Sequence, residues 1–167
     1  MKENSAPLPE RAQTAFRKLV VSAANLNSVS DELRQTITEI EAALRKLNVG
    51  LAAWVNISTS SGERGDSWSR DLGYTRYGKD WYVALRTTYS DVTEDDDNED
   101  QWPFNEAPRW MRVEAIGKLP ELIEALAKQA DDTAEKIKRK NAEAKQFTEA
   151  ILGSFPPPAP PPLPNRK

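Results

Sequence analysis

The chain has 167 residues, of which 38% are hydrophobic and 29% charged, so we expect one modest domain with appended segments. It contains no cysteine and no histidine, which excludes disulfides, zinc sites of the usual kinds and catalysis by a thiolate or an imidazole. No window approaches the roughly 18–20 apolar residues of a membrane span, and residues 1–10 lack the apolar stretch of a secretory signal. We therefore expect a cytoplasmic protein that needs no cofactor and no metal.

A first long helix is predicted for residues 9–48. Apolar side chains recur there at alternating spacings of four and three from Ala12 to Leu47, and only Ser30 breaks the repeat. About five consecutive heptads of this kind are typical of a coiled coil rather than of an ordinary amphipathic helix. Gly50 follows as a suitable stop, so we expect one uninterrupted helical rod.

A second long helix is predicted for residues 119–152, where apolar residues follow the same repeat. If it folds back on the first helix with Leu119 beside Leu47, the polar interruptions of the two repeats fall in one region. This coincidence favours an antiparallel coiled-coil hairpin within one chain. The second helix has smaller core residues, so the hairpin would bury a limited area, which favours self-association into a homo-oligomer.

Residues 50–90, between the two helices, are predicted to form a three-stranded antiparallel meander. The apolar period changes there from 3.5 to 2, as expected for strands with one buried face. The alternating segments are residues 51–58, 68–75 and 81–88. The sheet should therefore have an inner face turned to the core and an outer face turned away from it.

The register of the last two strands follows from a tight turn predicted at residues 77–80. With this turn, Leu72 lies opposite Leu85 on the inner face of the sheet. Asp71 then lies opposite Arg86 on the outer face. Apolar and ionic side chains both find matching partners across the strands, which supports the register.

Residues 91–101 are predicted to form an acidic loop, with seven acidic residues and no basic one between Asp91 and Asp100. Carboxylates at alternate positions raise the question of a calcium site. However, the loop lacks the glycine that an EF-hand needs at its sixth position, and Trp102 stands where the bidentate glutamate would be. A solvated loop is the expected structure.

The predicted fold class is α+β: two long antiparallel helices, forming a coiled-coil hairpin, flank a three-stranded antiparallel β-meander. A short helix is expected at residues 107–116, and a disordered proline-rich tail at residues 154–167. Residues 1–8 are also expected to be disordered. Residues 9–153 would then form a single domain.

The tail offers a candidate partner-binding site at Pro161, Pro164 and Arg166. These residues fit the P-x-x-P-x-R spacing of one SH3-ligand orientation. In that mode the prolines of an extended helix enter aromatic grooves, and the arginine meets an acidic rim. An SH3-like module is therefore the candidate partner for the tail, with a merely solvated tether as the alternative.

The outer face of the predicted sheet offers a second candidate site, formed by Trp54, Tyr82 and Arg86. Aromatic residues interleaved with arginine occur at protein interfaces and on platforms that stack single-stranded nucleic acid. In a third interpretation the short helix, which carries Trp110, covers this face and turns it into a second core layer. The sequence leaves all three interpretations open.

The missing catalytic residue types and the heptad repeats favour a non-catalytic protein–protein interaction or scaffold protein rather than an enzyme. It would assemble through its helical rods and bind protein partners through the sheet face and the tail, without membrane association. A nucleic-acid-binding regulator is the alternative, which a net charge of −3 without clustered cations does not support. A carboxylate-dependent hydrolase is least favoured, because no glycine-rich phosphate loop, nucleophile elbow or paired-acid cleft is apparent.

Overall fold

The computed structural model describes residues 7–62, 66–90 and 98–154. The chain divides into two compact units, within residues 1–126 and 127–167. The elements, in chain order, are α1 (Leu8–Leu47), β1 (Ala53–Ser61), β2 (Ser67–Tyr77), β3 (Asp80–Ser90), β4 (Asn98–Pro103), α2 (Arg109–Ala115) and α3 (Leu119–Gly153), with 3₁₀ turns at Phe104–Glu106 and Ile116–Lys118. Unit 1 holds everything up to the first turns of α3, and unit 2 holds the remainder of that helix. The fold is thus an α+β combination of a long N-terminal helix, a four-stranded antiparallel sheet and a C-terminal helix.

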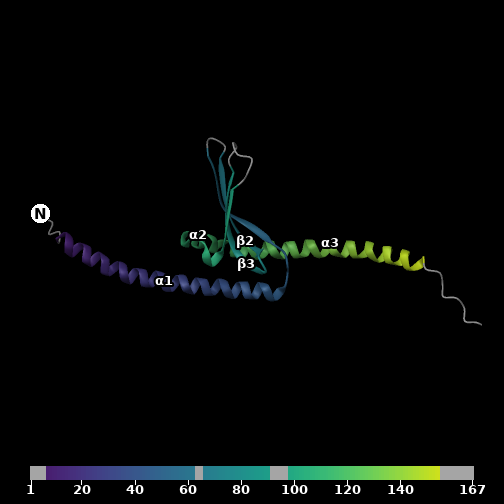
Figure 1. Ribbon diagram of the computed structural model, residues 1–167, viewed down its shortest axis with the longest axis horizontal. Coiled ribbons are helices and arrows are strands. Elements are labelled where there is room, and N and C mark those ends of the chain that lie inside the picture. Colours follow the sequence, from purple (N-terminus) through teal and green to yellow (C-terminus); the bar gives the residue numbers. More distant parts are fainter. Residues whose placement is uncertain (1–6, 63–65, 91–97, 155–167) are drawn as a thin grey trace, which may run out of the picture. The chain divides into compact units, whose positions relative to one another are not determined.

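Helix α1 is a single helix of 40 residues, as predicted. Pro9 lies in its first turn, where a missing backbone N–H removes no helical hydrogen bond. The helix ends because Asn48 adopts a left-handed backbone with φ 49°, and Gly50 follows with φ 64°. Within unit 1, the C-terminal half of α1 lies along the sheet and its N-terminal half extends beyond it (Figure 1).

The four strands follow one another in the sheet in chain order, and every neighbouring pair is antiparallel. The predicted register of β2 and β3 is confirmed. The pairs are Leu72 with Leu85, Asp71 with Arg86 and Tyr77 with Asp80. The tight turn depends on Gly78, whose φ of 63° is a conformation that residues with a Cβ rarely adopt.

Strand β4 corrects the acidic loop predicted at residues 91–101. The segment 98–101 pairs with β3 and belongs to a fourth strand, so the predicted three-stranded meander is wrong. The strand lies at the edge of the sheet, where charged residues are tolerated and an alternating apolar pattern is not required. The sequence pattern therefore gave no signal for it. Residues 91–97 lie outside the described residues.

The hydrophobic core of unit 1 lies between the inner face of the sheet and the helices. Helix α1 contributes Ile37 and Leu44, and the first turns of α3 contribute Leu122 and Leu126. The remaining buried apolar side chains come from the strands, the 3₁₀ turn after β4 and α2: Ala53, Leu72, Tyr74, Val83, Leu85, Phe104, Ala107, Met111 and Ala115. One core thus joins residues from Ile37 to Leu126.

The predicted coiled-coil hairpin is wrong. Its seam positions are exposed in the N-terminal half of α1, as at Phe16 and Leu19, and along α3, as at Ile137 and Phe147. From Leu33 to Leu44 the α1 seam packs into the core beneath the sheet, whereas its last position, Leu47, is exposed. A heptad repeat shows that one face of a helix is apolar, but it does not show which element covers that face.

Two side chains of α1 complete the hydrogen bonding of β3 where β4 has ended. The last residue of β4 lies opposite Ala84, so the β3 backbone beyond that point has no strand beside it on that edge. There the carboxylate of Glu41 accepts a hydrogen bond from the backbone N–H of Val83 at 3.0 Å. The guanidinium of Arg45 donates to the carbonyl oxygen of Trp81 at 3.1 Å. The helix is thereby anchored to the sheet edge by polar as well as apolar contacts.

Glu41 is 7% exposed, and burial raises the pKa of its carboxyl above the ordinary value. The folded protein therefore holds this proton more tightly than the unfolded chain. The contribution of Glu41 to stability should be fully present below the ordinary glutamate pKa and be lost as the pH rises through the raised pKa.

Glu41→Gln retains an acceptor oxygen for Val83 but cannot ionise. We therefore expect its unfolding free energy not to fall as the pH rises through the raised pKa of Glu41. Glu41→Ala should cost about 1–3 kcal/mol, because it leaves a buried N–H without a partner. Urea denaturation at a series of pH values measures both effects. Identical pH profiles for wild type and Glu41→Gln would contradict the assignment.

Candidate functional site

The outer face of the sheet is not covered by a helix of unit 1. Helix α2 packs Met111 and Ala115 on the opposite, inner face, in the same cluster as Leu72 and Val83. The interpretation in which the short helix covers the outer face is therefore wrong. A protein interface and a nucleic-acid platform remain as interpretations of this face.

Trp54 lies across the outer face, over the neighbouring strand. Its partner in the β1–β2 register is Gly73, and a Cβ at that position would collide with the indole ring. The absence of a side chain at Gly73 therefore allows the indole to rest on the strand backbone. Arg86 stacks on the same ring, with its guanidinium carbon 4.1 Å from the ring centroid. The structure thus brings together two of the three predicted site residues.

Arg86 is part of a row of polar side chains that crosses the sheet. Its Nε donates to Oδ2 of Asp71 at 3.0 Å, and its Nη1 lies 3.7 Å from Oε2 of Glu99. The amide of Asn56 donates to the other oxygen of Asp71 at 3.1 Å. Two carboxylates flank one guanidinium, so the row carries a net negative charge and Arg86 is already engaged.

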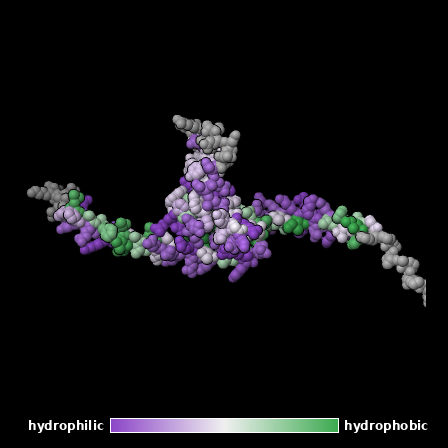
Figure 2. Space-filling model, viewed as in Figure 1, coloured by the Kyte–Doolittle hydropathy of each residue, from purple (hydrophilic) through white to green (hydrophobic). Residues whose placement is uncertain are grey.

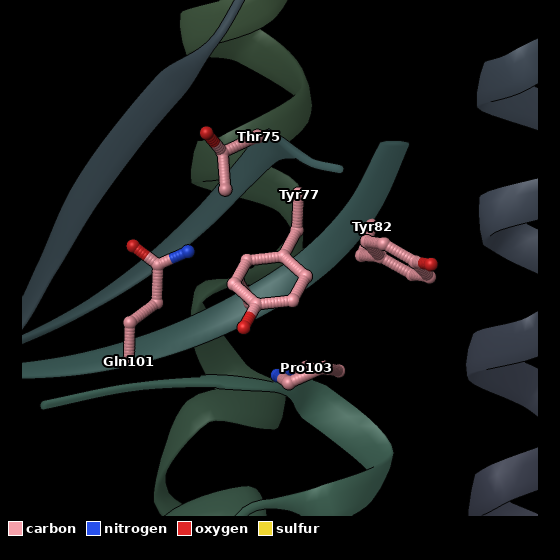
Figure 3. Close-up of a pocket in the computed structure, with 6 residues that line it drawn as sticks. Thr75, Tyr77, Tyr82, Gln101 and Pro103 are labelled. Carbon is pink, nitrogen blue, oxygen red and sulfur yellow. The ribbon is translucent and has the colours of Figure 1, made fainter. Parts of the chain in front are cut away.

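Tyr82 lies on the outer face but in a different place. It is four residues from Arg86 along β3, which is about 13 Å at 3.3 Å per residue. Tyr82 lines a small pocket together with Thr75, Tyr77, Ala84, Gln101 and Pro103, and Figure 3 shows the ring of Tyr77 between Gln101 and Tyr82. The third predicted site residue therefore belongs to a separate feature of this face.

Pro161, Pro164 and Arg166 lie outside the described residues. The SH3-ligand interpretation of the tail therefore stays a prediction.

The sequence analysis missed a cluster around Arg70 on the inner side of the sheet. The guanidinium carbon of Arg70 lies 4.2 Å from the ring centroid of Trp68 and 4.4 Å from that of Trp110. Its Nη1 lies 2.9 Å from Oε2 of Glu114, so the arginine links β2 to α2. The alternation of Trp68 and Arg70 along one strand was the available signal, but their partners in α2 are set only by the fold.

The groups with shifted pKa values belong to the packing of the core. Burial raises the pKa of Glu41 and of Tyr74 and lowers that of Arg112. Glu41 binds the sheet edge, and Tyr74 stacks on Trp81 with ring centroids 5.4 Å apart. Within residues 7–62, 66–90 and 98–154, no group of three or more acidic side chains could hold a metal ion.

The N-terminal half of α1 presents the most extensive exposed apolar face of unit 1. Figure 2 shows hydrophobic residues gathered along this part of the helix. They are Leu8, Phe16, Leu19, Val20, Leu26 and Val29, and Val21 is exposed outside this face. In this half of the helix the large apolar side chains that the heptad repeat places on one face have no partner in unit 1.

Two further apolar surfaces are present, one in each unit. In unit 1, the end of α1 and the start of α3 enclose an open groove lined by Ile40, Ala43, Leu44, Leu119, Pro120 and Ile123. In unit 2, α3 exposes Ile137, Phe147, Ile151 and Leu152. Neither long helix has an apolar stretch sufficient to cross a membrane, as judged over the described part of the chain.

Fold and surfaces together define a class: an α+β protein with an open antiparallel sheet and a long, partly uncovered amphipathic helix. No protein-family model matches this chain, and no curated protein or solved structure matches it either.

Proposed function

We propose that this protein is a non-catalytic scaffold that assembles through the exposed apolar face of α1. The observation that carries the proposal is the heptad repeat of α1, which packs against the core from Leu33 to Leu44 and is bare before Ser30. An apolar stripe of this length on one helix is larger than monomeric proteins usually expose. Covering this stripe with another helix would bury apolar surface, and each Å² buried would stabilise the assembly by about 25 cal/mol.

The sheet face is proposed as a second, separate surface for protein partners. Trp54 and Arg86 supply the aromatic and arginine side chains that protein interfaces favour. Nucleic acid is a poorer match, because Asp71 and Glu99 already neutralise Arg86 and would repel phosphates. The proline-rich tail, with an SH3-like module as its candidate partner, would add a third surface.

Sedimentation velocity over a range of protein concentrations tests the assembly step. We expect the wild-type chain to sediment as a concentration-dependent oligomer, both at full length and without residues 156–167. Leu19→Glu should shift the protein to monomer, because it places a charge in the middle of the apolar face. Leu19 is 61% exposed, so the substitution should leave the fold of unit 1 intact.

Val21→Glu is the matched control. Val21 is 71% exposed and lies in the same turn of α1, but it is not a seam position of the heptad repeat. Association should therefore persist in this variant. A wild-type chain that stays monomeric at all concentrations would contradict the proposal. Equal effects of Leu19→Glu and Val21→Glu would show that the heptad seam is not the contact.

A further inference from the structure

We infer that the partner of the α1 seam is a second copy of this chain, bound antiparallel and centred on residue 21. The inference rests on the proposed function and specifies its assembly contact. The free seam consists of the α1 heptad positions before Leu33: Ala12, Phe16, Leu19, Ala23 and Leu26, which are exposed, and Ser30, which is half-buried. Four independent features of this segment agree with the antiparallel arrangement.

The first feature is that the seam is complementary to itself when reversed. In an antiparallel pair, each a position of one helix shares a layer with a d position of the other. Centring on residue 21 gives layers of Phe16 with Leu26, Leu19 with Ala23, and Ala12 with Ser30. Leu19 thus meets a small alanine, the two large side chains Phe16 and Leu26 share a layer, and the polar Ser30 meets an alanine at the end of the seam, so no large apolar side chain faces the polar defect.

The second feature is length. In the same register, Pro9 lies opposite Leu33. Helix α1 begins at Leu8, and Leu33 is the first seam residue that packs against the core of unit 1. The partner helix therefore begins where the free seam ends, and the contact continues an apolar surface that is already covered within the chain.

The third feature is that the α1 positions flanking the seam are uncharged. The flanking positions that meet across the two-fold axis are Val20 with its own copy, Ser22 with its own copy, Ala15 with Val29, and Gln13 with Asn27. None of these pairs brings like charges together. The one charge at this edge comes from α2, where Nη2 of Arg109 donates to Oδ1 of Asn27 at 3.2 Å. Two helices can therefore approach closely.

The fourth feature is the distribution of charge along the helix. Residues 8–18 carry three basic side chains and one acidic, whereas residues 24–34 carry two acidic and one basic. Antiparallel pairing places the basic segment of each helix against the acidic segment of the other. Parallel pairing would place the basic segments side by side, so the electrostatic term favours the antiparallel orientation.

Single cysteines test the register, because the natural chain has none. In the proposed dimer the two copies of Ser22 lie only about 3 Å apart along the axis at 1.5 Å per residue. Ser22→Cys should therefore be joined into a covalent dimer by a short bismaleimide. The matched control is Ser28→Cys, which points away from the seam and lies about 21 Å from its copy along the axis, so it should stay largely unlinked.

Orientation is tested with Ala12→Cys and Ser30→Cys. Two copies of Ala12 are separated by about 27 Å in the antiparallel dimer, so Ala12→Cys alone should not crosslink. A mixture of Ala12→Cys and Ser30→Cys proteins should crosslink efficiently. Efficient crosslinking of Ala12→Cys alone would show a parallel pair and overturn the inference.

The outcomes separate this inference from the proposed function. If the chain associates and Leu19→Glu abolishes the association, but Ser22→Cys fails to crosslink, assembly through α1 stands and the register is refuted. If Ile137→Glu in α3 abolishes association instead, the seam partner is not a second α1 and the inference is refuted. A strictly monomeric chain refutes both.

Discussion

Replacing Phe104 with alanine is expected to lower the free energy of unfolding by about 3–5 kcal/mol. Phe104 has no exposed surface and is the largest side chain of the core that is completely buried. It lies in the 3₁₀ turn directly after β4, so its loss opens a cavity beneath the sheet and loosens the anchor of the edge strand. Chemical denaturation followed by circular dichroism measures the change.

Phe147→Ala provides the matched control for this substitution. Phe147 is 68% exposed in unit 2, so the same change of side chain should leave the unfolding free energy of unit 1 within about 0.5 kcal/mol. Similar losses at Phe104 and Phe147 would mean that Phe104 does not occupy the core position described above.

Gly73→Ala is expected to destabilise the protein by about 1–3 kcal/mol and to displace Trp54 from the outer face. The added Cβ would occupy space that the indole ring now fills. The ring must then move, which also separates it from the guanidinium of Arg86. The indole N–H signals in a proton–nitrogen NMR spectrum report the displacement, and thermal unfolding reports the cost.

Gly117→Ala is the corresponding control. A Cβ at Gly117 would meet no atom within 4 Å, and the backbone there does not have a positive φ. Stability should therefore stay unchanged or rise by about 0.4–1 kcal/mol, because alanine restricts the unfolded chain. A Gly73→Ala variant that behaves like Gly117→Ala would show that Trp54 does not lie over the strand.

Much of the local structure was predictable because it depends on neighbouring residues. The four-three repeat identified α1, and the turn at Gly78 set the register that places Asp71 opposite Arg86. The candidate site was half predictable for the same reason. Trp54 and Arg86 could be placed on one face from alternation, but alternation alone could not show that Gly73 brings the two side chains into contact.

The sequence by itself determined where apolar faces lie: along α1, along α3 and on one side of the strands. Only the tertiary structure decided what covers them. Burial of an apolar face is non-directional, so a sheet and a short helix can cover the seam from Leu33 to Leu44 as well as a second long helix could. The charged edge strand β4 likewise depends on backbone pairing with β3, which any sequence of side chains can provide and no periodicity reveals.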